Sequence, residues 1–231
     1  MMSFGKNLQF LRRMHNGMTQ EELAEQLHVS RQTVSKWESD AAYPEMEKVF
    51  ELCGFFSCSM DRLLRDDLNV GRDAYSPVGI RRIEGFRYAQ YAVISHQPED
   101  DALAHMEKWA AAQGVAPDLI GWDFPHVSQE QINVFHMHGY AAACILPEQF
   151  TGDGAGARLA AQPAARYAVI TIENPFLAPF DLIPNAYKTV LSYLEVNGVR
   201  HRADGKVLDC FERVYRKDET EYMDVLIAVE D

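Results

Sequence analysis

Residues 19–44, TQEELAEQLHVSRQTVSKWESDAAYP, decide the fold of the first part of this chain. Thr19 and Glu22 have the spacing of a capping box, in which each side chain binds the backbone amide of the other residue. A helix is therefore predicted to begin at residue 20. After Leu27, Ser30 is a suitable N-cap for a second helix over residues 31–38. The stretch predicts two short helices joined by a tight turn.

The helical pattern extends outward from this stretch to cover residues 3 to about 64. Apolar residues recur there at three- and four-residue spacing, which is typical of short amphipathic helices: Phe4, Leu8, Leu11, Leu23, Leu27, Val34, Trp37, Val49 and Leu52. We expect an all-α domain of about five helices over residues 1–68. Residues 69–80 lack periodicity and carry Gly, Ser and Pro, so they are expected to form a linker.

Residues 81–231 show a different pattern, in which short β-rich runs alternate with two helical stretches. The run YAVIS at 91–95 is followed by an expected helix at 98–113 and strands at 119–124 and 140–146. The run YAVIT at 167–171 is followed by an expected helix at 182–197 and strands at 207–215 and 223–229. This half is predicted to be an α+β domain of two β-α-β-β repeats, with helices on one sheet face and an open ligand cleft on the other. The protein is thus expected to be multidomain.

Composition narrows the possible classes of protein. The 231 residues are 47% hydrophobic and 24% charged, as in ordinary globular proteins, and the net charge of −12 argues against coating nucleic acid or membranes by bulk electrostatics. The four cysteines lack CxxC spacing, and no apolar run approaches the ~20 residues of a membrane span. We expect a cytoplasmic protein with no membrane partner, no metal and no cofactor.

The 19–44 stretch, together with FSCSMDRLL at 56–64, resembles the lambda-repressor/Cro-type (Xre) helix-turn-helix family over residues 3–65. The resemblance implies that residues 31–38 enter the major groove of double-stranded DNA. Arg31, Gln32 and Lys36 would face base edges. Phosphate contacts are implied for a second set that does not read sequence: Gln20, Ser30, Thr33, Ser35 and Tyr43.

Three further positions matter within this resemblance. His28 and Asp40 stand where the family commonly has small residues or glycine. The family also implies an ion pair inside the domain, which we assign to Arg13 and Glu38.

Residues 1–70 carry eight Lys/Arg and eleven Asp/Glu, a net charge of −3. A single copy is therefore expected to bind DNA weakly, and we expect a homodimer on an inverted-repeat operator.

The second half resembles the gyrase-inhibitor-like (GyrI-like) effector-binding domain over about residues 78–231. The resemblance rests on the repeats, on Y-K-x-x-x-x-Y-L at 187–194, on Asp204-Gly205 and on CFERVY at 210–215. It implies a receptor for amphipathic, often cationic, small molecules. Gly139-Tyr140 fits the family, whereas Ala141 stands where an acidic residue is frequent.

Glu212 is the sharpest clue to a ligand site. In a strand over 207–215 it would share one face with Leu208, Cys210 and Val214. A carboxylate on an apolar face must be paired or must face a cleft, because an isolated buried charge is very costly. Alternatively, Glu212 is an exposed edge residue or pairs with a basic neighbour such as Arg213. Five aromatic residues are expected to complete the ligand site, although each is also compatible with the core: Trp122, Phe124, Tyr140, Tyr167 and Tyr187.

These patterns together predict a transcriptional regulator controlled by a small-molecule effector. No Ser/His/Asp or Cys/His set has a spacing that supports catalysis, so we expect no catalytic residues and no enzyme. Two alternatives stay open at this point. The second half is a hydrolase that uses a cleft glutamate, or the chain is a DNA-binding antitoxin or scaffold without a ligand.

Overall fold

The computed structural model describes residues 4–68, 72–124 and 127–231, so residues 69–71 of the expected linker lie outside the described residues. The chain forms two compact units. The helical unit contains the residues up to Gly79 together with 170–201, and the sheet unit contains 80–169 together with 202–229. Within the described ranges, no helix is both long enough and apolar enough to cross a bilayer.

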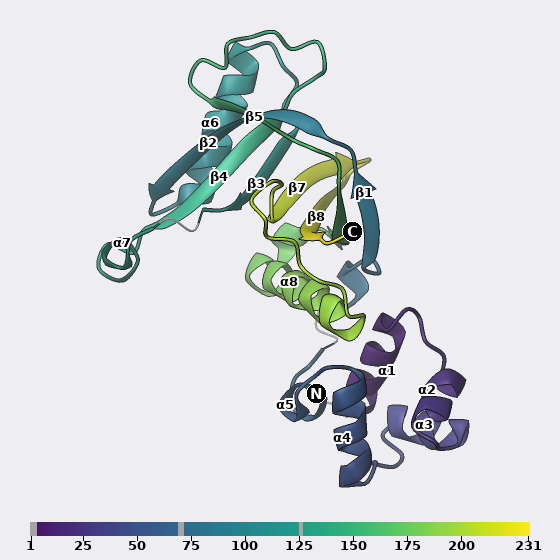
Figure 1. Cartoon of the computed structure of the whole chain (residues 1–231). Helices are drawn as coiled ribbons and strands as arrows, with labels where there is room; N and C mark the ends of the chain where they lie inside the picture. Colours follow the sequence, from purple (N-terminus) through teal and green to yellow (C-terminus); the bar gives the residue numbers. More distant parts are fainter. Residues whose placement is uncertain (1–3, 69–71, 125–126) are drawn as a thin grey trace. The chain divides into compact units, whose positions relative to one another are not determined.

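The first part of the helical unit has the five expected helices (Figure 1). The capping box of Thr19 and Glu22 is present, and Ser30 and Ser59 each accept a hydrogen bond from the third helical amide that follows them. The local sequence therefore sets three of the helix starts. The helices are α1 (Phe4–Met14), α2 (Gln20–Gln26), α3 (Arg31–Glu38), α4 (Met46–Phe55) and α5 (Met60–Leu64).

One core holds these helices together, and its members are almost all local in sequence. The exception is Val196, at the end of α8 (Pro179–Val196), which is 6% exposed and belongs to the same cluster. The helical unit also contains two short 3₁₀ helices, η1 (Arg72–Ala74) and η2 (Pro175–Leu177). The largest buried core side chains are Leu8, Leu11, Leu23, Leu52, Phe56 and Leu63.

The sheet has eight strands in the order β1-β6-β8-β7-β3-β4-β2-β5. It contains the two predicted repeats, β2-α6-β3-β4 and β6-α8-β7-β8, and β3 lies beside β7 where the repeats meet. The α+β fold class is confirmed, and β1 and β5 are edge strands that the sequence pattern did not indicate. The bounds are β1 (Gly79–Ile83), β2 (Phe86–Ser95), α6 (Pro98–Ala112), β3 (Leu119–Asp123), α7 (Gln129–Asn133), β4 (His138–Ile145), β5 (Arg158–Gln162), β6 (Ala165–Glu173), β7 (Cys210–Lys217) and β8 (Thr220–Val229).

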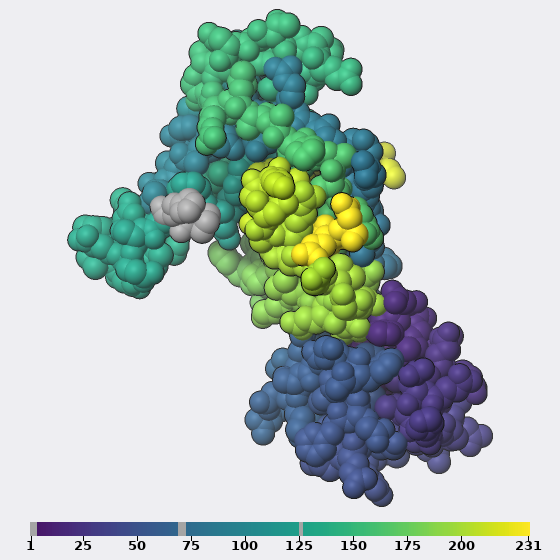
Figure 2. Space-filling view, viewed as in Figure 1, coloured from purple at the N-terminus to yellow at the C-terminus, as the bar shows by residue number. Residues whose placement is uncertain are grey.

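The two faces of the sheet carry different side chains. On one face α6 packs along β2 and β4, as Figure 1 shows, and small residues such as Ala142 let the helix approach closely. On the opposite face lies an aromatic cluster that includes Tyr88, Tyr167 and Phe211. Helix α7 projects from the sheet as a separate lobe (Figure 2).

The predicted strand over 207–215 is wrong in its start, because β7 begins at Cys210. Leu208 lies before the strand, where its amide donates a hydrogen bond to Gln162 Oε1. Val214, which does alternate with Glu212, is 41% exposed. Glu212 therefore does not lie on the continuous apolar strand face that the sequence suggested.

Candidate functional sites

Helix α3 has one buried and one exposed face. Val34, Trp37 and Glu38 are buried against the core, and four polar side chains on the other side are exposed to solvent. This division follows from 3.6 residues per turn, because apolar residues at 34 and 37 turn one stripe inward. The exposed side chains are Arg31, Gln32, Ser35 and Lys36, all of which the sequence placed at the DNA surface.

The expected phosphate-binding residues flank this exposed face. Ser30 Oγ lies 2.8 Å from Thr33 Oγ1 and accepts a hydrogen bond from the Thr33 amide, so both hydroxyls belong to the start of α3. The Gln20 side chain is held in place by a hydrogen bond that its Nε2 donates to Glu38 Oε2 at 2.9 Å. Tyr43 is 68% exposed, and its ring centroid lies 6.0 Å from that of Phe4.

A buried ion pair joins α1 to the end of α3. The guanidinium of Arg12 donates to both carboxylate oxygens of Glu38, with Nη2 to Oε2 at 2.9 Å, and it also donates to the Met18 carbonyl. The prediction that Arg13 is the partner of Glu38 is wrong, because Arg13 is exposed. Adjacent residues on a helix point about 100° apart, so only one of two neighbouring arginines can turn toward Glu38.

The two departures from the family pattern have a backbone explanation. His28 and Asp40 have φ angles of 53° and 54°, in the left-handed region that favours glycine. The Asp40 carboxylate compensates by accepting a hydrogen bond from the Gly5 amide at 2.8 Å. A Cβ added at Gly5 would lie 2.5 Å from the carbonyl oxygen of Trp37, so α1 and α3 approach each other closely here.

In the sheet unit, the structure brings Tyr140 and Glu212 together. The Tyr140 hydroxyl donates to Glu212 Oε2 at 3.4 Å, a long hydrogen bond. Tyr140 is 7% exposed, whereas Glu212 is half-buried. The strand register explains the meeting, because Gly121 of β3 lies opposite Glu212 on one side and opposite Ala142, two residues from Tyr140, on the other. All these positions face the α6 side of the sheet.

Gly121 creates the space for this contact. A Cβ added at Gly121 would overlap the hydroxyl and ring of Tyr140, so the phenol lies directly across the glycine. Sequence reasoning missed Gly121. A glycine inside a strand often marks a close approach by another group, and the G-W-D run at 121–123 carried that signal.

The surroundings of Tyr140 are electronegative. Burial raises the pKa of its phenol, and the nearby carboxylates of Glu212, Glu99 and Asp123 raise it further, so the hydroxyl stays protonated and can donate. Burial also raises the pKa of the Cys210 thiol to about 11, with Asp123, Asp209 and Glu212 adding to the effect. Such a group of carboxylates favours a cation in its vicinity.

The other four expected ligand residues come from three parts of the fold. Trp122 and Tyr167 face the opposite side of the sheet from Glu212, in the aromatic cluster. Tyr167 is fully buried there, and its hydroxyl donates to the Leu208 carbonyl at 3.0 Å. Phe124 is half-buried just after β3, and its amide donates to the Gly139 carbonyl. Tyr187 lies on α8, in the helical unit.

Replacing Gly121 with alanine is expected to displace Tyr140 and to destabilise the protein by about 1–3 kcal/mol, the usual effect of an extra methyl group in a packed site. Urea unfolding of the full chain measures the loss. Gly79→Ala is the matched control, because a Cβ added at that strand position meets nothing within 4 Å. Equal losses for the two variants would contradict the close approach of Tyr140 to Gly121.

The helical unit contains a helix-turn-helix domain, since residues 9–63 match the family model described as "Helix-turn-helix". Over 63 residues the chain is 52% identical to the HTH-type transcriptional activator BcrR of Enterococcus faecalis. That match spans 27% of this chain and 30% of BcrR, so the chain covers less than a third of its relative. The expected resemblance of the first 65 residues is confirmed.

Two solved structures resemble larger parts of the chain. The cryo-EM structure of an EcmrR-DNA complex matches with 12% identity and a TM-score of 0.49, over 93% of this chain and 85% of that one. The structure of SAV2435 bound to tetraphenylphosphonium matches with 12% identity and a TM-score of 0.39, over 66% of this chain and 93% of that one. Similarity at this level does not assign a ligand to this chain.

Proposed function

We propose that the protein is a sequence-specific DNA-binding transcriptional regulator that a small-molecule effector controls. The observation that carries the DNA-binding part is the exposed polar face of α3 on a buried helical core. Arg31, Gln32 and Lys36 contact base edges, and Gln20, Ser30, Thr33, Ser35 and Tyr43 contact phosphates. The net charge of −3 over residues 1–70 supports a homodimer on an inverted repeat, because two reading helices then share the binding.

The proposed effector is a lipophilic cation that binds beside Tyr140 and Glu212. Glu212, Glu99 and Asp123 supply negative charge around a buried phenol, and an aromatic face adds a cation–π contribution of about 0.5–2 kcal/mol. Phe124 remains a proposed member of this site, and Tyr187 remains a proposed ligand contact. Trp122 and Tyr167 are not part of this site, because they lie on the other face of the sheet.

We also propose that this half binds its ligand without catalysing a reaction. Around Glu212, the described residues offer a protonated phenol and the Cys210 thiol, whose raised pKa makes it a poor nucleophile. The proposed organisation is a DNA-binding domain at 1–68, a linker at 69–80 and an effector-binding domain at 81–231, in a protein of the cytoplasm.

The test uses two probes of the same shape and opposite charge, tetraphenylphosphonium and tetraphenylborate. Glu212→Gln keeps the size of the side chain but removes its charge. The variant is expected to weaken tetraphenylphosphonium binding by about ten-fold, equivalent to ~1.4 kcal/mol, because the cation loses its nearest carboxylate. Isothermal titration calorimetry on the full chain measures both probes.

Glu221→Gln is the matched control, because Glu221 lies on β8 in an ion pair with Arg216. It should leave the affinity for the cation unchanged. If Glu212→Gln binds the cation as tightly as the parent chain, or if the parent binds the anion better than the cation, the proposed site is wrong.

A further inference from the structure

The last turn of α8 is tied to the end of α1 by hydrogen bonds. His15 Nδ1 donates to the Val196 carbonyl at 3.0 Å, and Asn197 Nδ2 donates to the Met14 carbonyl at 3.2 Å. The Val196 side chain lies in the helix-turn-helix core. Helix α8 is therefore anchored at its C-terminal end on the same helix, α1, that contacts α3.

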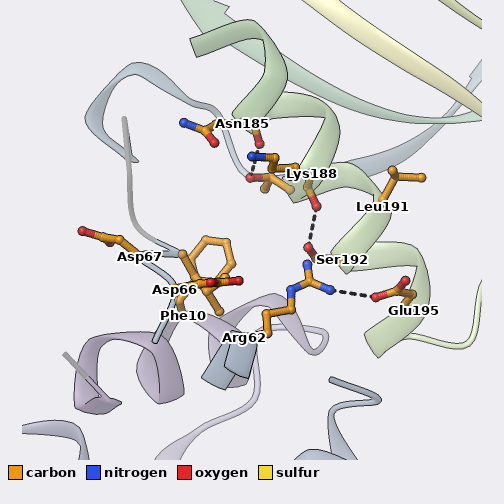
Figure 3. A pocket seen from close by; sticks show the side chains of 11 residues that line it. Phe10, Arg62, Asp66, Asp67, Asn185, Lys188, Leu191, Ser192 and Glu195 are labelled. Carbon is orange, nitrogen blue, oxygen red and sulfur yellow. Dashed lines mark hydrogen bonds and ion pairs between the residues drawn. The ribbon is translucent and has the colours of Figure 1, made fainter. Parts of the chain in front are cut away.

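An ion pair adds a second anchor in the same turn. Arg62 of α5 donates to Glu195 Oε2 at 2.8 Å, as Figure 3 shows. The preceding turns of α8 border a cavity instead. Lys188 and Ser192 line this cavity of about 520 Å³, and Phe10 and Arg62 line it from the other side (Figure 3).

A second cavity of about 450 Å³ adjoins the same helices and shares Phe10 and Thr189 with the first. Both hollows are partly open to solvent, so the turns of α8 that border them are not closely packed against α1 and α5. The buried oxygen Oδ1 of Asn197 also has no hydrogen-bond partner among the described residues. Buried polar atoms are rarely left unpaired, so this contact is not fully optimised in the arrangement seen. Both features leave α8 room to tilt about its last turn.

Helix α1 carries the effect of such a tilt to the exposed face of α3. Met14 and His15, at its C-terminal end, meet α8. Gly5 and Arg12, further along the same helix, hold the end of α3 through the close approach to Trp37 and the buried ion pair. A rigid helix that touches both elements can transmit a movement between them.

We infer that the last turn of α8, residues 195–197, positions the helix-turn-helix domain and that the effector changes DNA affinity through this contact. The inference rests on the proposed function, since it requires that an effector controls the protein. Glu195, Val196 and Asn197 are positioning residues, because they contact Met14, His15 and Arg62 and lie outside α3.

The experiment measures operator affinity of the full chain with and without tetraphenylphosphonium, on an operator selected from random DNA. Glu195→Arg is expected to change the ligand-free operator affinity at least three-fold and to bring the ratio of the two affinities close to one. The double variant Arg62→Glu/Glu195→Arg exchanges the two charges and re-forms the ion pair. It should restore both the ligand-free operator affinity and the ratio of the two affinities. Glu221→Arg makes the same change in charge on β8 and should alter neither.

The outcomes separate the two proposals. If Glu195→Arg matches Glu221→Arg in ligand-free operator affinity, the positioning role is wrong, whether or not the probe binds. If the parent responds to the probe and Glu195→Arg responds equally, the effector acts by another route. If Glu212→Gln binds the probe normally, the effector site fails, while the ligand-free comparison still decides the role of α8.

Discussion

Replacing Arg12 with methionine is expected to destabilise the helix-turn-helix domain by about 3–5 kcal/mol. The side chains of Arg12 and Glu38 are both nearly buried, at 8% and 2% exposure. Removing the guanidinium leaves the carboxylate in a low-dielectric site, where the Gln20 amide is too weak a partner to replace a full positive charge. Chemical denaturation of the full chain, followed by circular dichroism at the helix signal, measures the loss.

Arg13→Met is the control for this variant, because Arg13 is the neighbouring exposed arginine and its replacement should change stability by less than ~0.5 kcal/mol. The double variant Arg12→Met/Glu38→Leu removes both charges and should recover most of the stability. Equal losses of stability for Arg12→Met and Arg13→Met would show that Arg12 does not form the buried ion pair with Glu38.

Replacing Arg31 or Gln32 with alanine is expected to cost about 1–3 kcal/mol of binding on the selected operator and much less on random DNA. Both side chains are exposed at the start of α3, where a helix that enters the major groove contacts base edges. Fluorescence anisotropy with labelled operator and labelled random duplex, at one fixed salt concentration, measures both affinities.

Arg65→Ala supplies the control for lost charge, because Arg65 follows α5 and its side chain is 78% exposed. This variant should lower the affinity for both duplexes to a similar, small extent. Equal losses on the operator and on random DNA for Arg31→Ala would mean that Arg31 contacts phosphates and does not read sequence.

The helix starts could be predicted because their determinants are local. Thr19 and Ser30 cap the next turn of the chain, and a capping hydrogen bond needs no knowledge of the rest of the fold. The choice between Arg12 and Arg13 depended instead on how α1 crosses α3, which no local pattern contains. For the same reason the core could not be recognised as extending to Val196, about 130 residues beyond α5.

In the sheet, the sequence of a single strand predicts which of its residues share a face. It does not predict which residues of two different strands lie on the same face of the sheet. Trp122 and Glu212 were expected in one cleft, yet the pairing of Gly121 with Glu212 turns them to opposite sides. The meeting of Tyr140 with Glu212 likewise depends on the register of β4, β3 and β7. A shift of one residue in either pairing would move one of them to the other face.

The pairing of β3 with β7 has a consequence for the origin of the effector site. Gly121 of the first repeat and Glu212 of the second lie directly opposite each other where the repeats meet. On the flanking strands, Ala142 of β4 lies opposite Gly121 and Val225 of β8 lies opposite Glu212. One repeat supplies the glycine that makes room for Tyr140 and the other supplies the carboxylate, so the proposed site needs both repeats and neither β-α-β-β unit could form it alone.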